Sequence, residues 1–266
     1  TTEIYTLSLH DALPNLVGDG INLFVDEKRS IMHHPAVNYI IALTDIIAGG
    51  YRPDDVLRLI KTGLTDLSDD AAEVFENYVR NYRISGPLFR KPLTRGATEL
   101  DPEMMKQLET SRKSVIDPVV QFAAEYHGKD SVQEKVECLY RYLTDTCRMT
   151  ERIAQNIDEA IQEGELEQAG ESAQIWNVIV GIFDQMVEIT GDLSLSQKDF
   201  AAMFRSGFEA VEIGLIPPSL DGLMMGNMKR TRTGTVRAML VLGANEGILP
   251  APTRSEERRV GKECRS

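Results

Sequence analysis

A short basic cluster near the C-terminal end of the chain contains the residue types that hold phosphate groups. Residues 228–234 read Met-Lys-Arg-Thr-Arg-Thr-Gly, so Lys229, Arg230 and Arg232 alternate with threonine hydroxyls. Cations and hydroxyls of this kind are the usual donors to the backbone of a nucleic acid. The alternative is a solvated segment that leads into a strand, and the charge pattern alone favours neither interpretation.

A second pair of cations, Lys28 and Arg29, follows the apolar run Ile-Asn-Leu-Phe-Val at 21–25. Loops at the edge of a parallel sheet often contact ligands, so this pair could lie on the same edge as the basic cluster. The sequence therefore offers five candidate nucleic-acid contacts, with Lys28 and Arg29 the weaker two.

Motifs for other chemistry are missing from the sequence. It contains no GxxxxGK[ST] or GxGxxG phosphate loop, no GxSxG nucleophile motif and no HExxH metal motif. The glycines of residues 242–247 fit a turn, because Asn and Gly are typical turn residues. We assign no catalytic, cofactor-binding or metal-ligating residue.

The histidine and cysteine residues favour structural roles. His33 and His34 are adjacent and precede Pro35, which is typical of a helix entry. Cys138 and Cys147 lie nine residues apart on a predicted helix without a CxxC spacing. Buried free thiols in a reducing compartment are the expected outcome.

Composition limits the remaining classes of function. The 266 residues carry a net charge of −12, which argues against nucleic-acid binding over the whole surface but allows a local basic groove. No apolar run approaches the length of a membrane span, and no secretory signal is present. We therefore expect a cytoplasmic location.

Both ends look foreign to the fold. Thr2–Pro14 and Arg254–Ser266 resemble translations of a sequencing-adapter sequence, so we expect residues 1–14 and 254–266 not to be native. The alternative for the second segment is a natural basic tail.

Between these ends the sequence predicts a strand, a long series of helices and a second strand. The predicted strands are 21–25 and the nearly continuous apolar run 236–242, which suits a buried parallel strand. Helix starts are expected at Pro35, near Pro53, at a Ser68 cap, at Asp101-Pro102 and at a Ser194 or Ser196 cap, with Pro118 kinking or splitting one long helix. The one long irregular segment is 85–97, which contains prolines, glycines and basic residues.

The simplest topology places the two strands in one sheet and inserts residues 51–216 between them as a helical domain. Such insertions are tolerated where their entry and exit points lie close together. The predicted fold class is α/β and predominantly helical.

Three stretches carry a resemblance to a known family. They are GINLFVDEKRSIMHHPAV, IIAGGYRPDDVLRLIKTGLTDLSDDAAEVFENYVRNYRISG and MKRTRTGTVRAMLVLGANEGILPA. Together they resemble the B subunit of AddAB-type ATP-dependent helicase/deoxyribonucleases, and the resemblance covers nearly all of residues 15–253.

This resemblance implies a RecA-like (P-loop NTPase-like) domain 2A of a UvrD-like helicase, interrupted by an all-helical 2B domain. Residues 15–50 and 217–253 would form parts of domain 2A, and residues 51–216 would form the 2B insertion. It also implies an A subunit and DNA as partners. The parent subunit would carry a 4Fe–4S cluster, Mg²⁺ and ATP, whose sites lie outside this chain.

Two departures from the family pattern fit a motor that has degenerated. Asn22 stands where a proline commonly follows Gly-Ile, and residues 229–234 replace a His-Ser-x-Lys-Gly stretch. The leading hypothesis is a non-catalytic DNA-binding and scaffolding segment of an enzyme that processes double-strand breaks. The alternatives are a helical module that docks the A subunit without contacting DNA, and a self-sufficient NTPase, which the missing phosphate loop disfavours.

Overall fold

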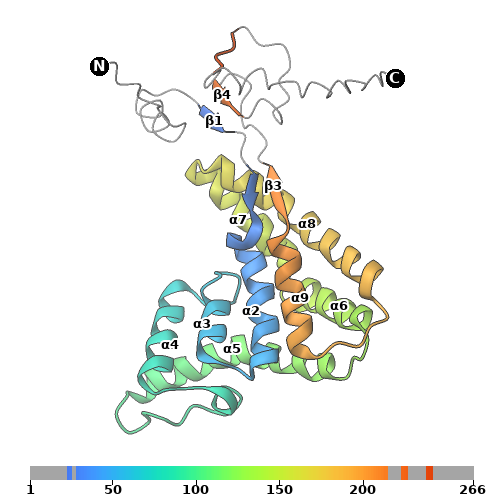
Figure 1. The fold of residues 1–266 in the computed structure, drawn as a ribbon. Helices are drawn as coiled ribbons and strands as arrows, with labels where there is room; N and C mark the ends of the chain where they lie inside the picture. The colour runs from blue at the N-terminus through green and yellow to red at the C-terminus, as the bar shows by residue number, and fades with distance from the viewer. Residues whose placement is uncertain (1–22, 26–27, 215–222, 227–237, 242–266) are drawn as a thin grey trace, which may run out of the picture. The chain divides into compact units, whose positions relative to one another are not determined.

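The computed structural model describes residues 23–25, 28–214, 223–226 and 238–241 (Figure 1). The chain divides into two compact units, Thr1–Gly226 and Asn227–Ser266, and the described part of the second is residues 238–241.

Helices dominate the first unit, which confirms the predominantly helical class predicted from the sequence. The α-helices are α2 (Pro35–Gly49), α3 (Pro53–Ile60), α4 (Asp69–Asn81), α5 (Pro102–His127), α6 (Val132–Arg141), α7 (Met149–Glu163), α8 (Leu166–Thr190) and α9 (Gln197–Glu209). Short 3-10 turns occupy η1 (Ile31–His33) and η2 (Gly86–Leu88), and η3 (Tyr142–Thr146) is a π-helical turn.

Local sequence signals fix several helix starts. Pro35 is the first residue of α2, and the ring of His34 accepts a hydrogen bond from the amide of Ala36. Ser68 caps α4 by accepting from the amide of Ala71 at 3.4 Å, as predicted. Of the two predicted caps of the last helix, Ser196 is the residue used.

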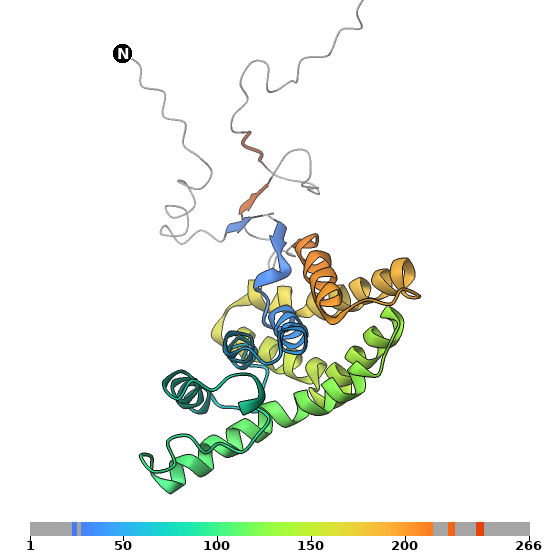
Figure 2. The same ribbon diagram turned by 60° about the horizontal axis from the view of Figure 1, so that its bottom comes forward.

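Helix α5 continues through its internal proline. Pro118 lies inside the uninterrupted 26-residue span Pro102–His127, so it does not split the helix into two. Figure 2 shows this long helix with the segment that joins it to α4 folded against its N-terminal part.

Helix α2 is the centre of the helical body (Figure 1). It packs against α3 on one side and α9 on the other, and ten of its fifteen residues are buried. Asp45 on α2 ties the three helices together, because its carboxylate accepts from Arg58 of α3 at 3.1 Å and from Arg205 of α9 at 2.6 Å. The helical body therefore includes α2, which precedes the predicted start of the insertion at residue 51.

The strands form two small pairs. Strand β1 (Leu23–Val25) runs parallel to β4 (Leu223–Met225), with Leu23 opposite Leu223. Strand β2 (Lys28–Ser30) runs antiparallel to β3 (Glu212–Gly214). Segments from before and after the helices are thus paired side by side.

The predicted strand at 236–242 is not supported by its described residues. Ala238–Val241 forms no strand, and Leu240 is 88% exposed. A buried strand needs a paired neighbour, and β1 pairs with β4 instead. The prediction is wrong for these four residues, and β4 is a strand that the sequence pattern did not indicate.

Candidate nucleic-acid interface

Two of the five predicted contact residues lie within the described structure, on strand β2. Lys28 and Arg29 are each about half exposed, at 51% and 47% of their side chains. The ammonium of Lys28 is 3.8 Å from the carboxylate of Glu212, and the guanidinium of Arg29 is 2.7 Å from that of Glu167. Exposed pairs of this kind contribute little to stability, so both cations can exchange a carboxylate for a phosphate.

Strand β2 lies where the chain enters the helical body, and its partner β3 lies where the chain leaves it. Arg29 links β2 to the first turn of α8 through Glu167. Gln174 of the same helix donates to the carbonyl of Gly214 at 3.4 Å. The structure therefore brings Lys28 and Arg29 together at this paired entry and exit. Lys229, Arg230 and Arg232 lie outside the described residues.

His34 is a structural residue of the helix entry, as predicted. It is 6% exposed, and its two ring nitrogens contact the amide of Ala36 and the hydroxyl of Ser172 at 3.1 and 3.2 Å. Burial lowers the pKa of His34 from 6.5 to about 4, so the ring is neutral near pH 7.

Cys138 and Cys147 are buried free thiols, as predicted. The sulfur of Cys147 lies 3.0 Å from the hydroxyl of Tyr39. Burial raises the pKa of both thiols, which disfavours the thiolate form that attacks electrophiles or binds metals.

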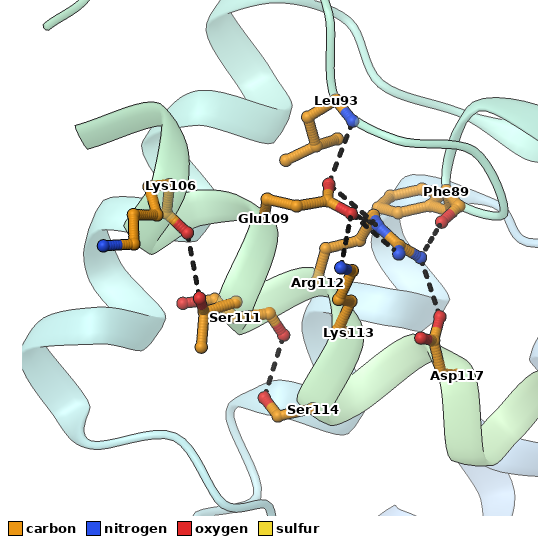
Figure 3. Close-up of polar contacts among 10 residues, drawn as sticks. Phe89, Leu93, Lys106, Glu109, Ser111, Arg112, Lys113, Ser114 and Asp117 are labelled. Atoms are coloured by element: carbon orange, nitrogen blue, oxygen red, sulfur yellow. Dashed lines mark hydrogen bonds and ion pairs between the residues drawn. The ribbon is translucent and has the colours of Figure 1, made fainter. Parts of the chain in front are cut away.

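The irregular segment between α4 and α5 is an ordered part of the structure (Figure 3). The guanidinium of Arg112, 5% exposed, donates to Glu109 at 3.0 Å, to Asp117 at 2.9 Å and to the carbonyl of Phe89 at 3.2 Å. Glu109 in turn accepts from the amide of Leu93 at 3.0 Å. These contacts fasten the segment to α5.

The electrostatics of this cluster favour its charged forms. Burial alone would lower the pKa of Arg112, but its hydrogen bonds to Glu109 and Asp117 raise it overall. Burial would likewise raise the pKa of Glu109, but the bonds from Arg112 and the Leu93 amide lower it overall. Sequence reasoning missed this cluster; the available signal was Glu109 and Arg112 three residues apart on a predicted helix.

Curated relatives match most of the chain, while no protein-family model matches it. The B subunit of the ATP-dependent helicase/deoxyribonuclease of Alkaliphilus metalliredigens is 32% identical over 244 residues, which cover 86% of this chain and 21% of the relative. That of Alkaliphilus oremlandii is 34% identical, covering 87% and 21%. That of Clostridium botulinum (strain Langeland) is 32% identical, covering 89% and 21%.

The chain is a homologue of these B subunits. The family resemblance found in the sequence is therefore confirmed. The chain spans about a fifth of the length of the relatives it matches.

Two further findings apply to the described residues of this B-subunit homologue. No three His, Cys, Asp or Glu side chains among them lie together so that they could hold a metal ion. None of the helices in the described ranges has the length and apolar character needed to cross a membrane.

Proposed function

We propose that the chain is a non-catalytic, helicase-like DNA-binding and scaffolding segment of the B subunit of a bacterial ATP-dependent helicase/exodeoxyribonuclease. That enzyme would process double-strand breaks for recombinational repair in the cytoplasm. The observation that carries the proposal is the 31–34% identity to named B subunits along most of the chain. On this proposal, the fragment alone is inactive.

The proposed architecture is a RecA-like domain 2A interrupted by a helical 2B domain. It is supported by the parallel pairing of β1 with β4, since parallel strands require a long crossover and the helical body lies between them in sequence. We set the limits of the 2B domain near residues 28 and 214 rather than 51 and 216, because α2 packs with α3 and α9 and because β2 pairs with β3.

The proposed partner is the A subunit, because the relatives are named as one subunit of an assembly. ATP, Mg²⁺ and a 4Fe–4S cluster would belong to other parts of the parent complex. The two described thiols do not fit a cluster site, because neither belongs to a group of three or more potential metal ligands in the described part of the chain. No step of the enzyme's chemistry is assigned to residues of this chain.

Lys229, Arg230 and Arg232 are the proposed backbone contacts to DNA, with Lys28 and Arg29 as weaker ones. In the intact complex, we expect replacing Lys229, Arg230 and Arg232 with Ala to lower the salt slope of duplex DNA binding by about 0.9 for each lost phosphate contact. Fluorescence anisotropy at several salt concentrations measures the slope. An unchanged slope and affinity would show that these residues do not contact DNA.

A further inference from the structure

The segment between α4 and α5 is locally basic in an acidic chain. Residues 77–98 contain five basic residues, Arg80, Arg83, Arg90, Lys91 and Arg95, and no acidic residue, whereas the whole chain has a net charge of −12. We define the basic loop as residues 83–95. We propose that the basic loop is a second surface that contacts the phosphate backbone of duplex DNA, at a site separate from the five predicted residues.

The basic loop is held rigidly from several sides. Phe89 is fully buried and Ile84 is 2% exposed, so both anchor the loop in the core. The amide of Gly86 donates to the carbonyl of Tyr51 at 2.9 Å. The guanidinium of Arg95 donates to the carbonyls of residues 82 and 83 at 2.8 and 3.0 Å, which closes the loop on itself.

The Arg112–Glu109 cluster completes this support from α5, because it binds the carbonyl of Phe89 and the amide of Leu93 within the loop (Figure 3). Because the backbone that carries the cations is already ordered, binding costs no backbone ordering, and preorganisation of this kind favours affinity.

None of the four exposed cations of the loop has a carboxylate within 4 Å among the described residues. Arg95 is held by backbone carbonyls, which leaves Arg83, Arg90 and Lys91. The acidic residues that flank the segment have other partners. Glu76 pairs with Lys61 and Arg80, and Glu99 accepts from the hydroxyl of Tyr82. The cations therefore differ from Lys28 and Arg29, which are already paired, and they remain available to an external anion.

The rings of the segment argue for contacts to phosphates rather than to unstacked bases. Within the segment, Tyr78 and Phe89 are 4% and 0% exposed. Tyr82 is partly exposed, but its ring packs on Tyr78 with 4.9 Å between the ring centres and its hydroxyl donates to Glu99. The neighbouring Tyr51 is 6% exposed, and the guanidinium of Arg90 lies 5.4 Å from the centre of its ring. Proteins that bind single strands present aromatic rings on which bases stack. Rigid cations without such rings suit the regular phosphate array of a duplex. The inference rests on the proposed role of the chain in DNA processing.

The test replaces Arg83, Arg90 and Lys91 with Gln in the full chain and measures binding to a fluorescent DNA duplex across a salt series. We expect affinity to fall about tenfold or more at low salt, and the salt slope to fall by about 0.9 per lost phosphate contact. A matched control also removes three positive charges, by replacing Lys129, Arg141 and Lys198 with Gln. Lys129 lies in the turn before α6, Arg141 is the last residue of α6, and Lys198 lies in α9. The control should keep most of the wild-type affinity. Circular dichroism verifies that both variants fold.

Each outcome decides the inference. Equal losses in both variants would show a general charge effect, and an unchanged slope in the loop variant, or no binding of duplex by the wild type, would overturn the proposal. The proposal would also be overturned if the loop variant bound DNA normally but no longer associated with its partner subunit, because the loop would then be a protein contact. The variant of Lys229, Arg230 and Arg232 separates the two proposals: if it alone weakens binding, the proposed function stands and the basic loop plays no part.

Discussion

Arg112 shows how a single buried charge can organise a segment far from it in sequence. Its guanidinium is almost fully buried, yet it has carboxylate partners on two sides and a backbone carbonyl 23 residues earlier. A buried charge is costly unless its hydrogen bonds are satisfied, and here each partner is supplied either by α5 or by the segment that α5 supports.

Replacing Arg112 with Ala should lower the free energy of unfolding by about 3 kcal/mol, because the mutation removes the guanidinium that donates to Glu109, Asp117 and the buried Phe89 carbonyl. Urea denaturation measures this change. Lys113→Ala is the matched control: Lys113 is 61% exposed and lies 4.0 Å from the same Glu109, so its loss should cost less than about 0.5 kcal/mol. Similar losses in the two variants would contradict the assigned role of Arg112.

His34 makes stability depend on pH. Its folded-state pKa is lowered from 6.5 to about 4, so protonation favours the unfolded chain. The stabilisation is complete above pH 6.5 and is lost as the pH falls from 6.5 towards 4, with a maximum of about 3 kcal/mol.

His34→Asn keeps a side chain that can cap α2 and removes the titrating ring, so its stability should fall less than that of the wild type between pH 7 and pH 4. Unfolding measured at several pH values tests this. The control is His33→Asn, which replaces the neighbouring exposed histidine and keeps the buried ring of His34. If His34→Asn follows the wild-type curve, burial of His34 is not the cause.

At the scale of the elements, the sequence predicted what local chemistry determines. The helix starts at Pro35 and Ser68 were correct because a proline and a cap act through neighbouring amides. The strands were harder: β2, β3 and β4 have three residues each, which is too short to show a period. The run at 236–242 had the composition of a buried strand, but composition does not supply a partner.

The candidate site could likewise be predicted only in part: its cations could be identified from the sequence, but their partners could not. Lys28 and Arg29 were identifiable as cations after a strand, but their partners Glu212 and Glu167 are more than 130 residues away and no spacing rule connects them. The sequence also did not show that residues 85–97 adopt an ordered conformation. Prolines and glycines indicate irregular backbone, whereas its rigidity comes from Arg112 and Glu109 on the following helix.

For the whole molecule, the central position of α2 decides where the helical body begins. The chain enters this body through β2 and leaves it through β3, and these strands are paired. A segment whose ends are paired in this way can be separated from its flanks without breaking its core. Residues 28–214 contain both strands of that pair and all eight α-helices of the described structure.

We therefore expect residues 28–214, expressed alone, to be helical by circular dichroism and to unfold in one cooperative urea transition. Residues 51–214, which start at the boundary predicted from sequence, lack α2 and should not unfold cooperatively, because the faces of α3 and α9 that pack on α2 would be exposed. Equal cooperativity in the two fragments would show that α2 is dispensable and would return the boundary to residue 51. A cooperative transition in the longer fragment alone would place α2 within the inserted domain.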